Sequence, residues 1–466
     1  MHVLRTALPA LILFGLTGCP EVATPDAGSS PDAYILLSDA GPSDAFAHDA
    51  PARDAGSGDA GMSGDAGRDA GPPPPSGPVL YPFGERHSPM PLDVADTLRM
   101  RAAASPAQDD DVFAKVGDSI TVSTSFMNCF VSGPLDLAGR TSLMPTINHF
   151  RGGSAGSTDP FRRVSLAAGV GWSASRALMG TPSPLTNELG ALTPRFATLM
   201  YGTNDIGFTD IDVFGRNMTR IADQMLAGGT IPVMSSIPPR DDSAMIDARV
   251  PLYNALLRAI AQSRQVPFVD YHRELLSLPD HGLSTADGIH PQASMGGCVF
   301  TAAGLRAGAN VRNLIVIEAL DRLRRVLVLG EDSLDASAPR LMGEGTRAAP
   351  YIVSSLPFAA HGDTRTGGES AVARWDACSM ANEGGRELRF RFRLASARRV
   401  TAAVSSGTGA DIDVHVIRAG GGPAECIARD NRQVDVDLAA GEYELVADTF
   451  TNATGPLAGE VFVMIL

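Results

Sequence analysis

Three short motifs carry the side chains of this sequence that could do chemistry. Gly117-Asp118-Ser119-Ile120 follows an apolar run, Gly202-Thr203-Asn204-Asp205 follows another, and Asp287-Gly288-Ile289-His290 comes last. Together they offer a hydroxyl group, a side-chain amide, and a carboxylate three residues ahead of an imidazole. These are the groups needed to cleave an ester through an acyl-enzyme. Each motif alone is weak evidence, whereas the three in this order predict a catalytic serine.

The chemistry gives each of these residues a role. A serine hydroxyl is a poor nucleophile at neutral pH, so Ser119 needs a base, and we predict that His290 takes its proton. The base needs a carboxylate that fixes its tautomer, which we predict to be Asp287. The charge that develops on the attacked carbonyl oxygen needs hydrogen-bond donors, and the amide of Asn204 and the backbone N–H of Ser119 are candidates.

The two remaining acids of these motifs have simpler interpretations. Asp118 follows a glycine and can cap the helix that starts after it, so we expect a local hydrogen bond there. We expect Asp205 to orient loops rather than to react. His272 and His281 are not spaced as a metal pair, and we predict neither a metal nor a cofactor.

Residues 110–327 resemble the SGNH hydrolases, also called the GDSL esterases and lipases. The resemblance rests on the three motifs and on the glycine-rich segment 168–173, which matches the family's second conserved block. It implies that Ser119 is the nucleophile and that Asp287 and His290 complete the triad. It also implies an oxyanion hole formed by three residues: Ser119, Gly171 and Asn204.

The sequence departs from the family pattern at two places. Ile120 stands where leucine is common, which is a trivial change. Ala167-Ala168 stands where the second block has an asparagine. The second departure leaves open which glycine of that block donates to the oxyanion, Gly169 or Gly171; our prediction is Gly171.

Short β-rich runs alternate with amphipathic stretches between Val112 and Leu329. The candidate strands are 112–116, 163–167, 196–201, 230–236 and 267–271, and the candidate helices are 213–227, 245–263 and 311–328. Alternation of this kind predicts a three-layer α/β fold, a flavodoxin-like parallel sheet flanked by helices, with sites at the carboxyl ends of strands. Residues 129–159 lack clear periodicity and are predicted to be an insertion over the cleft.

The pattern changes after Gly330 to β-rich segments separated by turns. The candidate strands are 387–394, 399–404, 411–417, 434–438, 442–447 and 460–465, which predict an all-β sandwich. Segments 408–414 and 440–445 resemble the prepeptidase C-terminal domain of secreted hydrolases, which implies a binding or stabilising accessory domain. Asp411 and Asp413 could touch calcium, but we interpret them as exposed strand-edge or turn carboxylates.

The N-terminus has the pattern of an export signal. A basic start, Met1–Arg5, precedes the apolar run 6–16 and the small residues before Cys19. The apolar run is too short for a lasting transmembrane helix. Its end resembles a bacterial lipobox, which implies that Cys19 is lipidated and that the exported protein is anchored to the cell envelope. An ordinary signal peptide cut later is the alternative.

Residues 20–78 repeat Asp-Ala-Gly and Asp-Ala and have too little apolar content to fold, so they are a candidate linker. They hold nine Asp and one Glu against two Arg, while the whole chain has a net charge of −14. The remainder is nearly balanced, which argues against nucleic acid as a partner. The predicted domains are the signal (1–19), the linker (20–78), a hydrolase domain (79–330), a connection (331–348) and the sandwich (349–466).

Five cysteines suit an oxidising compartment. Cys19 is assigned to lipid, and the other four divide by domain into the pairs Cys129–Cys298 and Cys378–Cys426. The first bridge would join the segment after Ser119 to the segment after His290. Free buried thiols are the alternative.

The sequence favours an exported serine esterase that removes O-acyl groups, such as acetyl esters of a carbohydrate or a lipid. One alternative is an inert hydrolase-like protein that only binds a surface partner, and a second is an acyltransferase that uses the same residues. The complete set of nucleophile, base, acid and amide favours an enzyme. It does not separate hydrolysis from acyl transfer.

Overall fold

The computed structural model describes residues 77–294 and 296–466. Cys19, the predicted signal and all but the last two residues of the predicted linker lie outside the described residues. The structure contains both predicted disulfides, Cys129–Cys298 and Cys378–Cys426, which indicate an extracellular protein. No helix in the described ranges has the length and apolar content to cross a membrane.

The N-terminal part is built on a four-stranded parallel sheet with the order β1-β3-β4-β5. Its strands are β1 (Asp109–Gly117), β3 (Pro194–Met200), β4 (Ile231–Ser235) and β5 (Phe268–Val269). They confirm four of the five predicted strands and the α/β class. Every residue of β3, β4 and β5 is buried, as expected for a parallel sheet that is covered on both faces.

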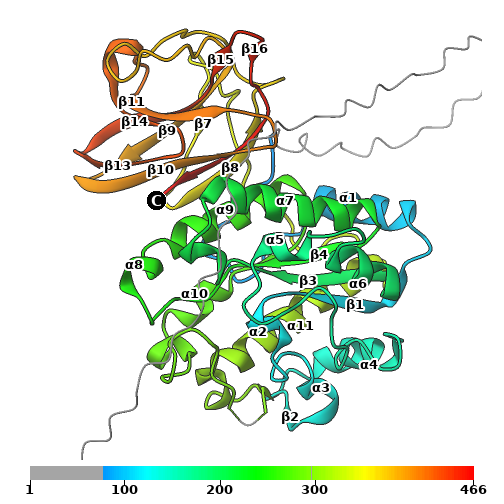
Figure 1. Ribbon diagram of the computed structural model, residues 1–466. Helices are drawn as coiled ribbons and strands as arrows, with labels where there is room; N and C mark the ends of the chain where they lie inside the picture. The colour runs from blue at the N-terminus through cyan, green and yellow to red at the C-terminus, as the bar shows by residue number, and fades with distance from the viewer. Residues whose placement is uncertain (1–76, 295) are drawn as a thin grey trace, which may run out of the picture. The chain divides into compact units, whose positions relative to one another are not determined.

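Helices cover both faces of this sheet (Figure 1). The longest are α7 (Ile211–Ala227), α9 (Val250–Ser263) and α11 (Gly308–Leu327). Figure 1 shows α7 and α9 on one side of the strands and α11 on the other. Shorter helices complete the layers: α1 (Leu92–Ala104), α5 (Ala174–Ala177), α6 (Pro184–Leu192) and α10 (Tyr271–Leu275).

The helix predicted over 245–263 is two helices, α8 (Ala244–Asp247) and α9. Pro251 lies in the first turn of α9. A proline lacks the N–H that would continue the hydrogen-bond ladder, and its ring would clash with the carbonyl group of Asp247. The chain therefore breaks between Asp247 and Val250.

The strand predicted over 163–167 is wrong, because these residues form a loop that ends in a single bridge between Gly117 and Ala168. The carboxylate of Glu188 accepts the N–H of Leu166 at 2.9 Å and also pairs with the side chain of Arg163. Val164 and Leu166 are 82% and 49% exposed, so the two large apolar side chains of this segment do not face the core. Side-chain bonds therefore replace the ladder that a strand would need.

Residues 129–159 were predicted to be an irregular insertion over the cleft, which is also wrong. They contain α3 (Cys129–Ser132), β2 (Leu135–Asp136) and α4 (Met144–Gly152). Phe150 of α4 is fully buried, and its ring lies 5.3 Å from that of Phe113 and 5.8 Å from that of Phe196. Helix α4 therefore packs on the sheet, because its apolar residues share one face.

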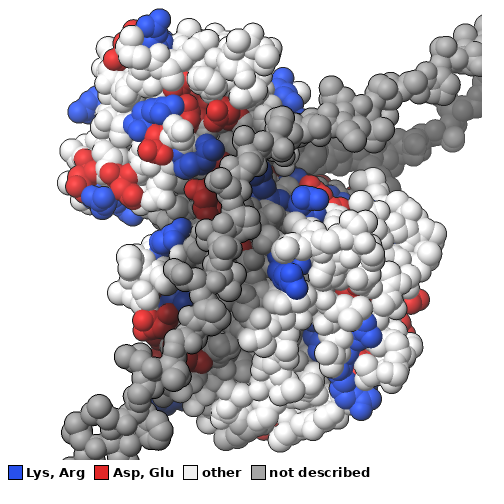
Figure 2. All heavy atoms as spheres, in the orientation of Figure 1, with Lys and Arg blue, Asp and Glu red and all other residues white. Residues whose placement is uncertain are grey.

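The C-terminal part is a sandwich of two sheets, antiparallel except for the parallel pair β7–β9, which confirms the predicted all-β class. One sheet has the order β13-β10-β17-β8, with bounds Gln433–Leu438, Arg398–Ser406, Glu460–Ile465 and Phe358–Asp363. The other has the order β12-β11-β14-β9-β7, with bounds Cys426–Asp430, Ile412–Arg418, Gly441–Thr449, Glu387–Leu394 and Tyr351–Ile352. Positive and negative side chains are interspersed on the face of the molecule seen in Figure 2.

Strands β7, β8 and β12 were not predicted. β7 has two residues, and β8 ends in the polar sequence His361-Gly362-Asp363, so neither has a complete apolar alternation. Asp413 also differs from its prediction as an exposed carboxylate. It is buried on β11 and pairs with Arg429 of β12.

Candidate active site

Ser119 lies at a sharp turn between a strand and a helix. β1 ends at Gly117, and the carboxylate of Asp118 accepts the Ile120 N–H at 3.0 Å, so Asp118 caps the short helix α2 (Ser119–Val122). A Cβ atom on Gly117 would lie 2.2 Å from the Thr121 hydroxyl oxygen, so only glycine fits this turn. Ser119 is the first residue of α2, where backbone N–H groups have no partner within the helix.

The structure brings Ser119, His290 and Asp287 together. His290 Nε2 lies 2.9 Å from Ser119 Oγ, and His290 Nδ1 lies 2.8 Å from Asp287 Oδ2. Burial would raise the pKa of Asp287, but the backbone N–H groups of His290 and Ile289 and the imidazole of His290 outweigh it and lower that pKa. An ionised Asp287 can hold a proton on Nδ1, which leaves Nε2 free to accept the serine proton.

The segment that carries the acid and the base is braced by the loop after β4. The N–H of Asp241 donates to the Gly288 carbonyl oxygen at 2.9 Å, and the Asp241 carboxylate lies 2.7 Å from His281 Nδ1. Gly288 has a φ of +64°, and a Cβ atom there would lie 2.7 Å from the backbone nitrogen of Asp242. Glycine is therefore required at the centre of the Asp287–His290 turn.

The hydrogen bonds of the second block separate its two candidate glycines. The N–H of Gly169 donates to the Gly117 carbonyl oxygen at 3.1 Å and is therefore occupied. Gly171 has a φ of +73°, and its N–H has no acceptor within the described part of the chain. The Asn204 amide donates to the Trp172 carbonyl oxygen at 3.0 Å, which leaves its second hydrogen free. These contacts favour Gly171 over Gly169 as a donor.

Asp118 and Asp205 are buried behind the turn that carries Ser119. Both oxygens of Asp205 accept the N–H of Ala174 at 3.1 Å, which fastens the second block to the third. Burial raises the pKa of Asp205 to about 7 and that of Asp118 to about 6, although the guanidinium of Arg312 opposes the shift at Asp118. Both side chains bond to backbone N–H groups and fix loops.

Arg312 on α11 contacts the nucleophile helix and is a site residue that the sequence analysis missed. It is buried, and it donates to the Ile120 carbonyl oxygen at 2.7 Å and to the Thr121 hydroxyl at 2.9 Å. Its guanidinium carbon lies 3.8 Å from the centre of the Phe126 ring. Arg312 thus holds the C-terminal end of α2, whose first residue is Ser119.

Asn313 is the second site residue that the sequence analysis missed. Its side chain accepts the N–H of Met127 at 2.9 Å and donates to the carbonyl oxygens of Ser125 and Gly297 at 2.7 and 2.9 Å. It therefore links the segment after Ser119 to the segment after His290, beside the Cys129–Cys298 disulfide. The available signal in the sequence is the polar pair Arg312-Asn313 directly before the apolar run Leu314–Ile317.

A small cavity borders the proposed catalytic pair. It has a volume of about 30 Å³ and is lined by Ile120, Ser123, Ser125, Phe126, His290, Pro291, Ala309 and Arg312. This volume holds one or two small groups, since a single water needs about 10–15 Å³ on the same measure. The side chains of His290 and Asp287 are 45% and 41% exposed, so the triad is open to solvent.

Residues 116–295 match the GDSL-like Lipase/Acylhydrolase family. The match includes all three motifs and the glycine-rich second block. The chain therefore contains a lipase/acylhydrolase domain of the GDSL type, and the protein is an ester hydrolase. Arg312, Asn313 and the sandwich lie outside the matched residues.

Several solved structures are similar to parts of the chain. A GDSL-like lipase from Bacteroides thetaiotaomicron covers 49% of this chain and 98% of its own, at 14% identity and a TM-score of 0.29. A putative acylhydrolase from Bacteroides fragilis covers 48% and 95%, at 18% identity and a TM-score of 0.31. The pre-peptidase C-terminal domain of a collagenase from Bacillus anthracis covers 25% and 92%, at 13% identity and a TM-score of 0.18. No curated protein matches the sequence significantly.

Proposed function

We propose that the protein hydrolyses O-acyl esters through an acyl-enzyme on Ser119. The observation that carries this proposal is the continuous hydrogen-bonded chain from Asp287 through His290 to Ser119. Ser119 Oγ attacks the ester carbonyl while His290 Nε2 takes its proton. His290 then gives this proton to the leaving alcohol, and a water activated in the same way releases the acid and restores Ser119.

The oxyanion of each tetrahedral intermediate is held by three donors. These are the N–H groups of Ser119 and Gly171 and the free amide hydrogen of Asn204. Support comes from the bond between Asn204 and the Trp172 carbonyl group, which places this amide next to the Gly171 loop. Donors that are fixed before the reaction stabilise developing charge without reorganisation.

The preferred substrates carry a short acyl group, such as acetyl, on a larger carbohydrate or lipid alcohol. The cavity of about 30 Å³ beside His290 supports a short acyl chain. The exposure of His290 and Asp287 supports an alcohol part that remains outside the protein. A long acyl chain would need a larger apolar cavity next to the triad.

The proposal includes attachment to the cell envelope through a lipid on Cys19, with residues 20–78 as a spacer between the membrane and a hydrolase domain over 79–330. The lipobox-like end of the N-terminal apolar run supports it. Wild-type protein should partition with membranes and carry acyl groups at Cys19, whereas Cys19→Ala should not. Finding unmodified wild-type protein in the soluble export fraction would refute the anchor.

The test of the proposed function is a panel of nitrophenyl esters of increasing acyl length, together with acetylated glycans. Wild type should cleave acetyl esters fastest, and Ser119→Ala should lose several orders of magnitude in kcat. Ser132→Ala is the matched control, since Ser132 is an exposed serine on α3. Retention of most activity by Ser119→Ala would refute the mechanism, and a preference for long acyl chains would refute the short-acyl assignment.

A further inference from the structure

One face of the five-stranded sheet of the sandwich is polar and nevertheless buried. Pairing of β11, β14 and β9 places Asp413 and Glu387 beside Asp448. Because side chains alternate along a strand, one face then carries the residues Asp413, His415, Glu444, Asp448, Glu387 and Arg389. All of them are at most 2% exposed. The outer face of a sandwich normally meets solvent, so another part of the chain must cover this one.

The cover is the connection between β8 and β9, residues 364–386, called the strap here. The Trp375 ring of the strap stacks on the His415 ring with centroids 4.8 Å apart, and its N–H donates to Asp448 Oδ2 at 2.6 Å. The N–H of Val372 donates to the Glu387 carboxylate at 3.1 Å. The Cys378–Cys426 disulfide fastens the strap to β12. The strap therefore lies directly on the polar face.

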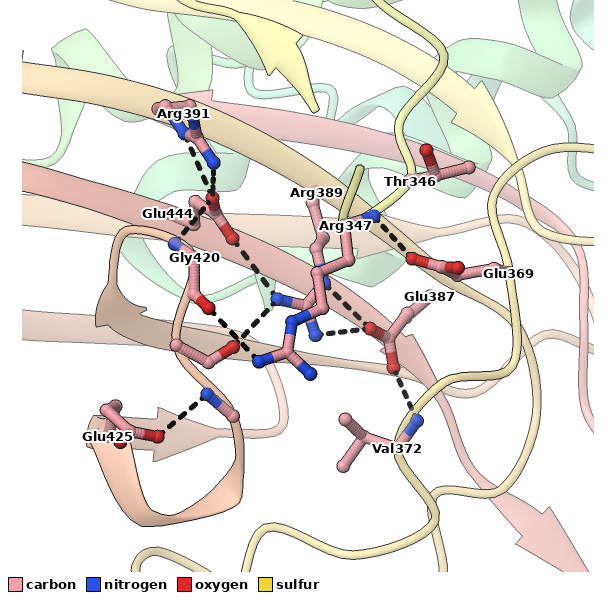
Figure 3. A network of polar contacts seen from close by, with 12 residues as sticks. Thr346, Arg347, Glu369, Val372, Glu387, Arg389, Arg391, Gly420, Glu425 and Glu444 are labelled. Atoms are coloured by element: carbon pink, nitrogen blue, oxygen red, sulfur yellow. Dashed lines mark hydrogen bonds and ion pairs between the residues drawn. The ribbon is translucent and has the colours of Figure 1, made fainter. Parts of the chain in front are cut away.

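Arginines neutralise one half of this face. Figure 3 shows Arg389 between Glu387 and Glu444, with Arg391 on the other side of Glu444. Arg389 is 2.6 Å from the Glu387 carboxylate and 3.2 Å from that of Glu444, and Arg391 is 2.7 Å from Glu444. Two arginines thus face two carboxylates. Each buried charge in this half of the face therefore has a partner of opposite charge.

The other half of the face has more negative than positive charge. Glu383, Asp413 and Asp448 bring three buried carboxylates, and Arg429 is the arginine that contacts them: it pairs with Asp413 and lies 3.5 Å from Glu383 Oε1. His415 Nε2 contacts Glu383 Oε2. Even a protonated His415 leaves one negative charge uncompensated, and a buried unpaired charge is costly.

The buried groups of this half that could bind a cation lie close together. Glu383, His415 and Asp448 each offer one atom to a set in which all atoms lie within 4.8 Å of one another. Glu383 Oε1 and Asp448 Oδ1 are buried oxygens with no hydrogen-bond partner among the described residues. Native structures rarely leave such oxygens without a partner or an ion.

We propose that Glu383, His415 and Asp448 bind a divalent transition-metal cation, with Zn²⁺ as the best fit. An imidazole nitrogen disfavours Ca²⁺ and Mg²⁺, which take oxygen ligands, whereas Zn²⁺ accepts histidine and carboxylate together. Two charges on the ion would compensate the carboxylates that Arg429 leaves unmatched. Trp375 already orients Asp448 through its N–H, as groups around a metal ligand commonly do.

The ligands come from three segments, namely the strap (Glu383), β11 (His415) and β14 (Asp448). The ion would therefore tie the strap to the sheet and stabilise the sandwich. None of its ligands belongs to the triad around Ser119. The metal should consequently change the stability of the sandwich and leave ester hydrolysis unchanged, so this inference and the proposed function fail independently.

The experiment uses the untagged full chain, freed of metal with a chelator and dialysed against Zn²⁺, Mn²⁺ or Ca²⁺. Bound metal is measured by elemental analysis, and melting temperatures are recorded with and without each ion. Wild type should retain about one Zn²⁺ per chain and melt at a higher temperature with it. Asp448→Asn and His415→Gln should lose both effects while their esterase activity stays unchanged, and a cooperative melting transition serves as the check that the sandwich of each variant is folded. Asp437→Asn is the matched control, because Asp437 is an exposed carboxylate of the same sandwich.

Three results would overturn the metal site. If wild type retains no Zn²⁺, a proton on Asp448 removes the uncompensated negative charge instead. Asp448→Asn that binds Zn²⁺ like wild type would place the ion elsewhere. Equal or greater stabilisation by Ca²⁺ would contradict a site with a histidine ligand.

Discussion

His290 Nε2 lies 2.9 Å from Ser119 Oγ although 171 residues separate the two in the sequence. Two parts of the fold maintain this distance. The strand-to-helix turn after β1 fixes Ser119, and the turn around Gly288, braced by Asp241, fixes His290. Buried groups from α11 and a disulfide join the two segments.

Asn204→Ala should lower kcat on the order of 10²- to 10³-fold, because one donor to the oxyanion is lost. KM should change little, since the contact strengthens in the transition state. Steady-state kinetics on an acetyl ester measure both constants. An effect on KM alone would show that Asn204 only binds substrate.

Arg312→Met should reduce kcat with little change in KM, because the C-terminal end of α2 loses the bonds to Ile120 and Thr121. Arg312→Lys should restore part of the activity, since an ammonium group can still donate to one of these oxygens. Arg325→Met is the control on the same helix, where a half-exposed pair with Glu331 is worth little. Equal activities of Arg312→Met and Arg325→Met would contradict a positioning role.

Asp205→Asn should change how stability depends on pH. The pKa of Asp205 is raised from 3.8 to about 7 in the folded protein. Its contribution to the free energy of unfolding is therefore fully present below pH 4 and is lost as the pH rises to about 7. The free energy of unfolding falls by at most about 1.4 kcal/mol per pH unit from this one group. Wild type and variant should melt alike near pH 4, and the variant should be the more stable near pH 8. Melting curves that differ by the same amount at every pH would exclude this titration.

Cys129→Ala/Cys298→Ala should lower both thermal stability and kcat. The bridge closes a loop of 169 residues, and the chain-entropy estimate for such a loop is on the order of 5 kcal/mol. It also joins the segment after Ser119 to the segment after His290. The matched control is Cys378→Ala/Cys426→Ala, which opens the sandwich disulfide and should spare kcat. Equal losses of kcat in the two double variants would contradict a specific link to the site.

The regular elements were predictable where burial is uniform. β3 and β4 are buried along their whole length, so their apolar runs identify them directly. The segment 163–167 has the apolar pattern of a strand, which is why a strand is predicted there. The Glu188 side chain that organises it as a loop comes from a separate helix, so the pattern does not reveal it. Arg312 and Asn313 were missed for the same reason, since their partners are far away in the sequence.

The sandwich shows a second limit of sequence patterns. Alternation along β9 predicts a strand with one polar face, but it does not tell whether that face meets solvent. Here the strap covers it, and the strap has no periodic pattern of its own. Its contacts through Trp375 and Glu383 depend on the tertiary structure.

The most direct test of the account is the covalent intermediate on Ser119. Wild type mixed with nitrophenyl acetate and quenched in acid within the first turnover should carry one acetyl group, and peptide mapping should place it on Ser119. His290→Ala should show almost no acetylation on the same time scale, and Ser119→Ala should show none. Rapid hydrolysis with no acetylated peptide, or acetylation of Ser119→Ala at another residue that matches the wild-type rate, would contradict the mechanism.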